Sequence, residues 1–336
     1  MRCLVTGGAG FIGSTLVRRL LARGDDVVTL DLLTYAGHVE NLAEVLDHPG
    51  HRFVHGDICD GALVRELLED REVVLNLAAE SHVDRSILSD QPFVRTNVQG
   101  TSTLLGAALD AGVARFVQVS TDEVYGELPW VDPEGPDAAS APRFTEETPL
   151  APRSPYSATK AAGDHLALAY HATHGLDVVV TRSSNNYGPR QFPEKLIPLM
   201  IARALADASL PVYGDGLHVR DWIHVDDHCR GIVAAAERGQ GGRVYNFGGD
   251  AERTNLSLVR TLLAILDKPE ALVEHVGDRP GHDRRYGIDS TRARRELEWA
   301  PEWSFDAGLR ACVAWYRVNP AWVAAVTGGV DQARPA

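Results

Sequence analysis

Lysine and positive charge are both scarce in this chain of 336 residues. Only Lys160, Lys195 and Lys268 are lysines among 33 basic residues, so arginine is used wherever either cation would serve. The formal net charge is −13. Nucleic-acid binding needs a basic face that displaces counterions, so this charge argues against a nucleic-acid partner. Any anionic ligand must therefore be held by a local cluster of cations.

Cysteine and long apolar runs are scarce as well. The four cysteines lie far apart with no CxxC pair, so neither a zinc site nor a disulfide framework is expected. No apolar run reaches the roughly 18 residues of a membrane span, and Met1 leads straight into strand-like sequence that leaves no room for a signal peptide. These absences predict a cytoplasmic protein with reduced thiols and no membrane partner.

Short β-branched runs alternate with helical periodicity over the first half of the chain. This alternation is typical of βαβ units and predicts a Rossmann-type, doubly wound parallel sheet in an α/β protein. The expected strands are 3–6, 27–31, 52–55, 73–77, 116–120 and 178–182. The expected helices are 12–23, 62–68, 94–111, 155–174, 194–206, 226–238, 256–266 and 305–318.

Two later stretches differ from this pattern. Seven prolines between residues 128 and 155 predict an ordered or semi-ordered surface loop over the sheet. After Arg182 the composition becomes richer in Gly, Pro and Arg. We therefore expect a second, smaller α/β domain that is discontinuous in sequence.

The stretch TGGAGFIG, residues 6–13, places Gly7, Gly10 and Gly13 between an expected strand and an expected helix. Glycines permit a tight turn whose backbone N–H groups and helix N-terminus can hold a pyrophosphate. Asp31 ends the next strand, where an acid accepts hydrogen bonds from ribose hydroxyls and would repel a 2′-phosphate. The pattern favours NAD over NADP. A tight structural turn beside a solvated aspartate is the alternative that would give the same residue pattern.

The stretch YSATK, residues 156–160, places Tyr156 and Lys160 on one face at the start of a helix. An ordinary surface pair is the alternative. Because lysine is rare here, its retention favours a chemical role, and a compact ammonium is suited to stabilising a phenolate. Bringing a tyrosine from pKa ~10 to near 7 takes roughly 4 kcal/mol. An adjacent lysine and a cationic nicotinamide could supply it together.

The stretch VSTDEVYG, residues 119–126, ends an apolar strand in Thr121, Asp122 and Glu123. Parallel sheets bind ligands at the carboxyl ends of their strands, although a solvated turn would also tolerate two acids. Together with LAAESHVDRS (77–86) and NNYGP (185–189), these motifs resemble the extended short-chain dehydrogenase/reductase family. FPEKLIP (192–198), VRDWIHVDDH (219–228) and DRPGHD (278–283) resemble the dTDP-glucose 4,6-dehydratases within it. The resemblance covers nearly the whole chain.

The resemblance implies dehydration of dTDP-glucose to its 4-keto-6-deoxy product with NAD retained throughout. Tyr156 would take the 4-hydroxyl proton, beside Thr121, as hydride leaves C4. Glu123 would then remove the C5 proton while a protonated Asp122 supplies one to the departing C6 hydroxyl, and hydride returns to C6. Neighbouring carboxyls in a dry pocket are pushed toward different pKa values, which suits opposite roles.

The same resemblance assigns the remaining site residues and the assembly. NAD would contact Gly7, Gly10, Phe11, Ile12, Gly13, Asp31, Thr34, Asp57, Ile58, Ala78, Ala79, Thr96, Tyr156, Lys160 and Asn186. The nucleotide sugar would contact Ser81, Thr121, Asn185, Lys195, Leu196, Pro211, Tyr213, Arg220, Asn255, Arg279 and His282. Residues 1–186 and 221–250 would form the NAD-binding domain, and residues 187–220 and 251–330 the nucleotide-sugar-binding domain. A homodimer would form through the helices near 94–111 and 155–174.

Other readings of the sequence stay open. A nucleotide-sugar 4-epimerase or decarboxylase, or a 4,6-dehydratase acting on UDP-glucose, would share most of these motifs. A regulatory protein that only binds NAD would keep the glycine turn but would not need Tyr156 with Lys160. We expect no metal, because His82 has no second ligand at metal spacing, and HVDDH (224–228) reads as a helix start capped by Asp226 or Asp227.

Overall fold

Short runs of Val, Leu and Phe form a seven-stranded sheet in the computed structural model, which describes residues 1–278 and 281–328. The strand order is β10-β6-β5-β4-β1-β2-β3, and every neighbouring pair is parallel. The six strands β3-β2-β1-β4-β5-β6 have the Rossmann order, so the predicted fold class is confirmed. The strands are β1 (Arg2–Thr6), β2 (Asp26–Asp31), β3 (His51–His55), β4 (Val73–Asn76), β5 (Arg115–Thr121), β6 (Val178–Ser183) and β10 (Val244–Phe247).

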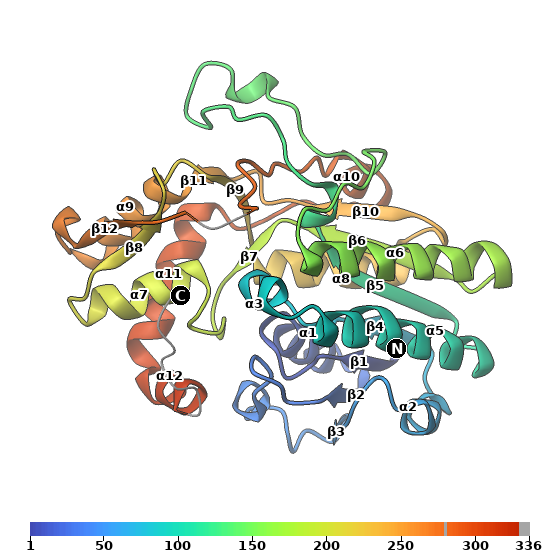
Figure 1. The fold of residues 1–336 in the computed structure, drawn as a ribbon. Helices are drawn as coiled ribbons and strands as arrows, with labels where there is room; N and C mark the ends of the chain where they lie inside the picture. Colours follow the sequence, from blue (N-terminus) through green and yellow to red (C-terminus); the bar gives the residue numbers. More distant parts are fainter. Residues whose placement is uncertain (279–280, 329–336) are drawn as a thin grey trace.

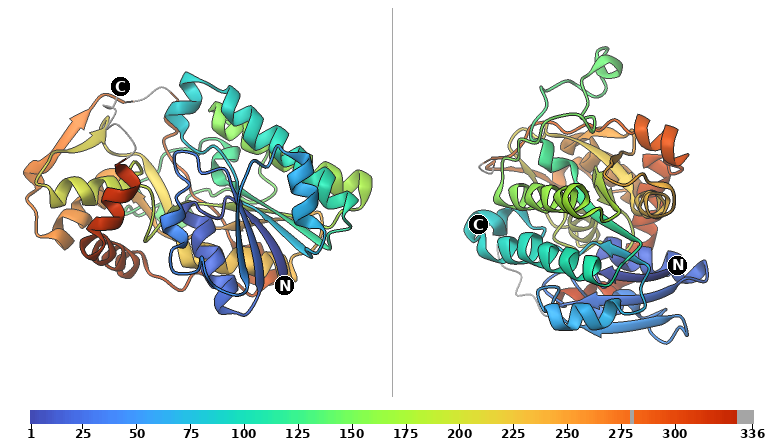
Figure 2. Two further views of the ribbon diagram at one scale, coloured as in Figure 1. Left: turned by 90° about the horizontal axis from the view of Figure 1, so that it is seen from below. Right: turned by 90° about the vertical axis from the view of Figure 1, so that its right-hand side faces the viewer.

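Helices cover both faces of this sheet (Figures 1 and 2). One face packs against α1 (Phe11–Ala22) and α8 (Val225–Arg238), and the other against α2 (Gly61–Leu68), α5 (Thr101–Asp110) and α6 (Pro155–His174). Each helix contributes a stripe of buried aliphatic residues to its face. The sheet is therefore packed between two apolar layers. The polar residues that end its strands lie outside these layers, at the carboxyl edge of the sheet.

Several predicted elements have different ends in the structure. The strand expected over 73–77 stops at Asn76, and the helix expected over 94–111 is a π-helix, η2 (Val94–Gly100), followed by α5. An apolar pattern does not distinguish the two hydrogen-bonding schemes. The edge strand β10 was not predicted, because its four residues carry too little periodicity.

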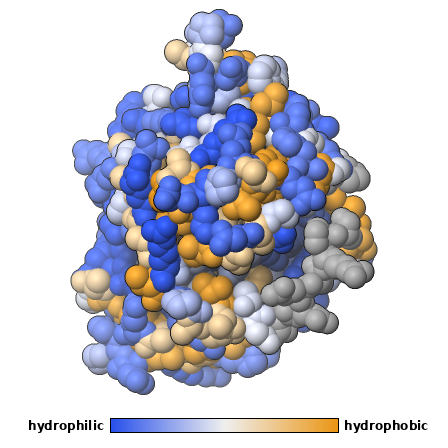
Figure 3. Space-filling model, turned by 90° about the vertical axis from the view of Figure 1, so that its left-hand side faces the viewer, coloured by the Kyte–Doolittle hydropathy of each residue, from blue (hydrophilic) through white to orange (hydrophobic). Residues whose placement is uncertain are grey.

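A second lobe is built from short strands and four helices around its own apolar core (Figure 1). Its strands are β7 (Asn185–Tyr187), β8 (Leu210–Tyr213), β9 (Val219–His224), β11 (Glu252–Thr254) and β12 (Val273–Val276). Its helices are α7 (Leu196–Leu205), α9 (Asn255–Leu266), α11 (Phe305–Val318) and α12 (Pro320–Thr327). Figure 3 shows this side of the molecule, where hydrophobic and hydrophilic residues are interspersed.

The helix predicted from residue 194 begins at Leu196, and the lobe's strands were not predicted individually. The remaining short elements are α3 (Val83–Leu88), α4 (Gln91–Phe93), α10 (Thr291–Leu297), η1 (Val39–Leu42), η3 (Asp122–Tyr125), η4 (Ala138–Ser140) and η5 (Glu270–Leu272). The predicted domain boundaries stay a prediction. Among residues 1–278 and 281–328, no helix combines the length and apolar character needed to cross a bilayer.

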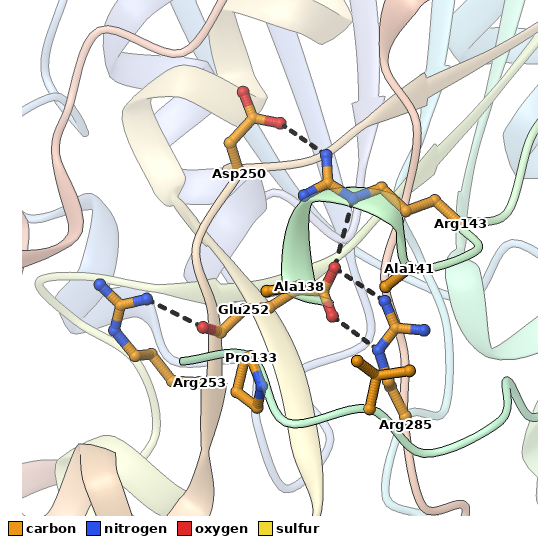
Figure 4. Close-up of a pocket in the computed structure, with 9 residues that line it drawn as sticks. Pro133, Ala138, Ala141, Arg143, Asp250, Glu252, Arg253 and Arg285 are labelled. Atoms are coloured by element: carbon orange, nitrogen blue, oxygen red, sulfur yellow. Dashed lines mark hydrogen bonds and ion pairs between the residues drawn. The ribbon is translucent and has the colours of Figure 1, made fainter. Parts of the chain in front are cut away.

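The proline-rich loop rises above the sheet (Figure 1, top) and is fixed by buried charge. Arg285 is 1% exposed and forms a two-pronged ion pair with Glu252, while its guanidinium also donates to the carbonyl of Pro142 in the loop. Figure 4 shows this pair beside a cavity of about 90 Å³, where Arg143 joins Glu252 to Asp250. The carboxylates of Asp250 and Glu252 are thus paired with arginines, and these ion pairs anchor the loop.

Candidate active site

The glycine turn between β1 and α1 is too tightly packed for side chains. Gly7 has φ +68°, and a Cβ there would lie 2.7 Å from the Ala78 backbone nitrogen. A Cβ at Gly13 would lie 2.1 Å from the Gly7 carbonyl oxygen. Gly10 precedes α1 and no side chain caps the helix, so its first N–H groups are left to bind an anion such as a phosphate. The cradle fits a dinucleotide.

Asp31 lies at the end of β2 beside this turn and is 8% exposed. Its two carboxylate oxygens accept hydrogen bonds from the backbone nitrogens of Ala9 (2.9 Å) and Leu33 (2.8 Å). Burial raises the pKa of this carboxyl, although both hydrogen bonds oppose the shift. An ionised carboxylate has further lone pairs, so Asp31 can still accept from a ribose hydroxyl.

The predicted catalytic residues lie at the carboxyl edge of the sheet. Thr121 ends β5 and is in register with Ser183 at the end of β6. The Thr121 hydroxyl accepts from the Glu123 nitrogen and donates to Asp122, both at 3.3 Å. These bonds turn the chain sharply into η3 and place the two acids directly after the strand.

Asp122 is 2% exposed, and one of its oxygens is buried without a hydrogen-bond partner among the described residues. Burial, followed by the negative charges of Glu123 and Asp221, raises the pKa of Asp122 well above its usual value, while Arg220 opposes the shift. Asp221 and Arg220 belong to β9, so the second lobe reaches the end of β5. The raised pKa favours the protonated form of Asp122, which is the form that can donate a proton.

Tyr156 and Lys160 lie in the first turns of α6, which Ser154 caps through a reciprocal pair of hydrogen bonds with Ser157. Burial, followed by the charge of Glu123, raises the pKa of Tyr156 well above its usual value. Burial lowers the pKa of Lys160 to about 8, and its ammonium donates to the Val119 carbonyl at 2.7 Å. Support of a Tyr156 phenolate by Lys160 stays a prediction.

A buried ion pair behind Lys160 was not predicted. Arg182 on β6 donates to Asp164 on α6 at 2.9 Å and to the Tyr125 hydroxyl at 3.0 Å. Asp164 also counteracts the lowering of the Lys160 pKa. Asp164 follows Lys160 by one helical turn, so the sequence could have indicated an acid beside this lysine. Arg182 could not be found, because one arginine among many gives no indication of its partner.

The other predicted cofactor residues surround the glycine turn and the ends of β3 and β4. Asp57 accepts from the Cys59 nitrogen and forms a 2.6 Å ion pair with Arg95. The side chain of Asn186 is held by Ser183 at 3.0 Å and by His228 at 2.9 Å. The remaining predicted positions lie in α1, in the segments after β2, β3 and β4, or in η2: Phe11, Ile12, Thr34, Ile58, Ala78, Ala79 and Thr96.

The predicted substrate residues come mainly from the second lobe. The Lys195 ammonium donates to the Ser81 carbonyl at 3.3 Å, and Arg220 stacks 4.3 Å above the Tyr286 ring. Asn185 and Asn255 each hold a buried side-chain oxygen that finds no partner in the described part of the chain. Leu196 begins α7, and Pro211 and Tyr213 lie in β8. Arg279 lies outside the described residues.

His282 stacks on His218 with ring centroids 3.6 Å apart and meets the edge of the Tyr213 ring. Asp278 lies 2.7 Å from His282 and 3.3 Å from His218, so the possible ligand atoms of these three residues lie within 4.8 Å. The two rings are nearly parallel, whereas ligating imidazoles point their ring planes at a shared ion. The arrangement suits stacking better than metal binding.

Two histidines that the sequence singled out begin helices. His82 caps α3 and lies 3.4 Å from Glu194. The prediction that Asp226 or Asp227 caps α8 was wrong, because the imidazole of His224 accepts from the Asp226 nitrogen. The Asp227 carboxylate instead accepts from the backbone of Glu302 and Trp303.

Residues 4–312 match the family model described as GDP-mannose 4,6 dehydratase. The chain belongs to this dehydratase family. It is 57% identical to a dTDP-glucose 4,6-dehydratase of Streptomyces griseus, with 95% of each chain covered. It is 56% identical to the low-salt glycan biosynthesis protein Agl12 of Haloferax volcanii, covering 94% of this chain and 98% of that protein.

Among solved structures, the dehydratase is similar to DesIV of Streptomyces venezuelae, a dTDP-glucose 4,6-dehydratase crystallised with NAD and TYD bound. The two are 50% identical with a TM-score of 0.92, covering 97% of this chain and 100% of that one. The resemblance that the motifs indicated is confirmed, and so is the prediction of an enzyme.

Proposed function

We propose that this dehydratase converts dTDP-glucose to dTDP-4-keto-6-deoxyglucose with NAD as a retained cofactor. The observation that carries the proposal is the buried Asp122 beside Glu123 at the end of β5, with a raised pKa and within one site with Tyr156. A 4-epimerase needs no acid–base pair for elimination. The names of the similar proteins also favour the dehydratase over the epimerase and decarboxylase alternatives.

In this proposal Gly7, Gly10 and Gly13 admit the pyrophosphate and Asp31 accepts from a ribose hydroxyl. When bound, NAD would accept a hydride from C4 of the sugar and later return it to C6. Tyr156 takes the proton of the 4-hydroxyl. Because the tyrosine pKa is raised here, this step depends on cationic charge beside the phenol, a role that we assign to Lys160, one helical turn further along α6.

Elimination then divides two tasks between consecutive residues. Oxidation at C4 makes the C5 proton acidic, and Glu123 removes it. Asp122 donates a proton to the C6 hydroxyl, which leaves as water. Burial and the neighbouring Glu123 raise the pKa of Asp122, which favours its protonated form and suits the two carboxyls to opposite roles.

The nucleotide diphosphate needs fixed cations in a protein of net charge −13. We assign this role to Lys195 and Arg220. Arg220 is 6% exposed and is held by the carbonyls of Val219 and Asp283, both at 2.8 Å. A guanidinium fixed in this way can present its remaining N–H groups to phosphate oxygens.

We further propose a cytoplasmic homodimer formed through η2, α5 and α6. Ile87, Leu88 and Val94 expose 46%, 83% and 42% of their surface, and they belong to α3 and η2, which both contact α6. Apolar side chains gathered beside a long helix favour a partner surface. A monomer mass in sedimentation equilibrium would contradict the dimer.

The substrate is tested by parallel turnover of dTDP-glucose, UDP-glucose and CDP-glucose. We expect the base-labile 4-keto chromophore to form fastest with dTDP-glucose. The thymine methyl group is worth about 1–3 kcal/mol in a hydrophobic pocket, so UDP-glucose should react roughly 10- to 200-fold more slowly. A protein that forms no 4-keto product from any of the three sugars would refute the proposed function.

A further inference from the structure

The C-terminal helix α12 connects the second lobe to the glycine turn. The indole nitrogen of Trp322 donates to the side-chain oxygen of Asn41 at 2.9 Å. The side-chain nitrogen of Asn41 in turn donates to the Ala9 carbonyl at 2.8 Å. Two hydrogen bonds therefore link a helix near the end of the chain to the turn that would hold the pyrophosphate of NAD.

Ala9 is held from both sides within this turn. Its nitrogen donates to Asp31 at 2.9 Å, and its carbonyl accepts from Asn41 and from the His38 nitrogen. Asn41 is only 3% exposed with the Trp322 ring in place, so removing the indole N–H while keeping a ring there would leave the amide oxygen buried without its donor. An unsatisfied oxygen at this depth favours movement of η1, and movement of η1 releases Ala9.

Trp322 is anchored in the second lobe, away from the sheet. Its ring packs edge-on against Trp315 at 5.0 Å and against Tyr316 at 6.2 Å, both in α11. Tyr316 is buried in the core of this lobe. The donor that satisfies Asn41 is thus fixed by the lobe that carries the substrate residues.

We propose that Asn41 and Trp322 are positioning residues for NAD, holding the glycine turn in its binding conformation. The inference rests on the proposed function, in which NAD must stay bound between giving up and regaining a hydride. Neither residue touches the cofactor in this proposal. Both act through Ala9, and their effect is expected in NAD affinity.

The test compares Trp322→Phe, which keeps the ring but removes the donor, with Trp315→Phe, a matched control in the same aromatic cluster. NAD binding to the cofactor-free full chain is measured by calorimetry, with dTDP binding as a second readout. We expect Trp322→Phe to weaken NAD binding about three- to tenfold, as expected for one lost hydrogen bond. Trp315→Phe should stay within about twofold of wild type, and dTDP binding should not change in either variant.

The same pair of measurements in an Asn41→Ala background decides whether Trp322 acts through Asn41. We expect no additional loss of NAD affinity from Trp322→Phe in that background. Equal NAD affinity of Trp322→Phe and wild type, an equal loss in Trp315→Phe, or a fully additive loss with Asn41→Ala would overturn the proposal. A wild-type chain that binds no NAD would overturn both this inference and the proposed function.

Discussion

The carboxyl edge of the sheet, where the strands end, and the second lobe hold their polar groups in different ways. At the sheet edge, Asp122, Tyr156 and Lys160 are between 2% and 8% exposed and lie where β5 ends and α6 begins. In the second lobe, the side chains of Lys195 and Asp278 expose 38% and 41% of their surface and lie just outside short elements. These three groups in the first region are shielded from water, whereas the second region is partly open to it.

This difference separates chemistry from recognition. Burial at the carboxyl edge of the sheet shifts pKa values: it raises the pKa of Asp122 well above its usual value and lowers the pKa of Lys160 to about 8. Half-exposed groups in the second lobe can pair with one another until a ligand arrives, as Asp278 does with His282. We therefore expect variants at the sheet edge to change the rate of chemistry and variants in the second lobe to change affinity.

Asp122→Asn should give the largest effect, because the amide cannot donate a proton to the leaving C6 hydroxyl. We expect product formation to fall about 10²- to 10⁴-fold while C4 oxidation partly survives. Stopped-flow absorbance of reduced cofactor, together with the 4-keto assay, separates the two steps. Asp90→Asn, which changes an exposed carboxyl before α4, serves as the control. Equal loss of both steps in Asp122→Asn would assign the residue to C4 oxidation.

Most of the main sheet could be predicted from the sequence because its central strands are runs of mostly buried aliphatic residues, whereas the edge strand β10 was missed. The candidate catalytic residues could be named because Asp122 and Glu123 directly follow β5, and because Tyr156 and Lys160 share one face at the start of a helix. The second lobe could not be predicted to the same depth. Its strand β9 reads VRDWIH and is buried throughout despite Arg220, Asp221 and His224, so its pattern resembles no ordinary strand.

Contacts between distant residues were also beyond prediction. The Arg285 ion pair with Glu252 and the bond of Trp322 to Asn41 join segments whose separation in sequence gives no sign of contact. A local motif predicts a local turn. A contact between distant segments is set only by how the folded elements pack, which the sequence alone does not reveal.

Lys160→Arg tests whether deprotonation of the Lys160 ammonium lowers turnover as the pH rises. The pKa of Lys160 is about 8, so the ammonium is present below that pH and lost above it. Wild-type turnover should decline as the pH rises through about 8. The guanidinium of Lys160→Arg stays protonated, so its decline should move to higher pH, with a rate about tenfold lower because of its larger, planar head. The surface variant Lys268→Arg should keep the wild-type profile, and an unchanged decline in Lys160→Arg would contradict the assignment.

His282→Ala should give the smallest effect and tests the other side of the comparison. Removing the imidazole deletes the stack on His218 and the proposed contact to the nucleotide sugar, so we expect KM to rise about three- to tenfold with kcat unchanged. His275→Ala, on β12 of the same lobe, is the matched control and should leave both constants unchanged. If His282→Ala lowered kcat and left KM alone, the second lobe would take part in the chemistry. The separation of rate from affinity between the two regions would then fail.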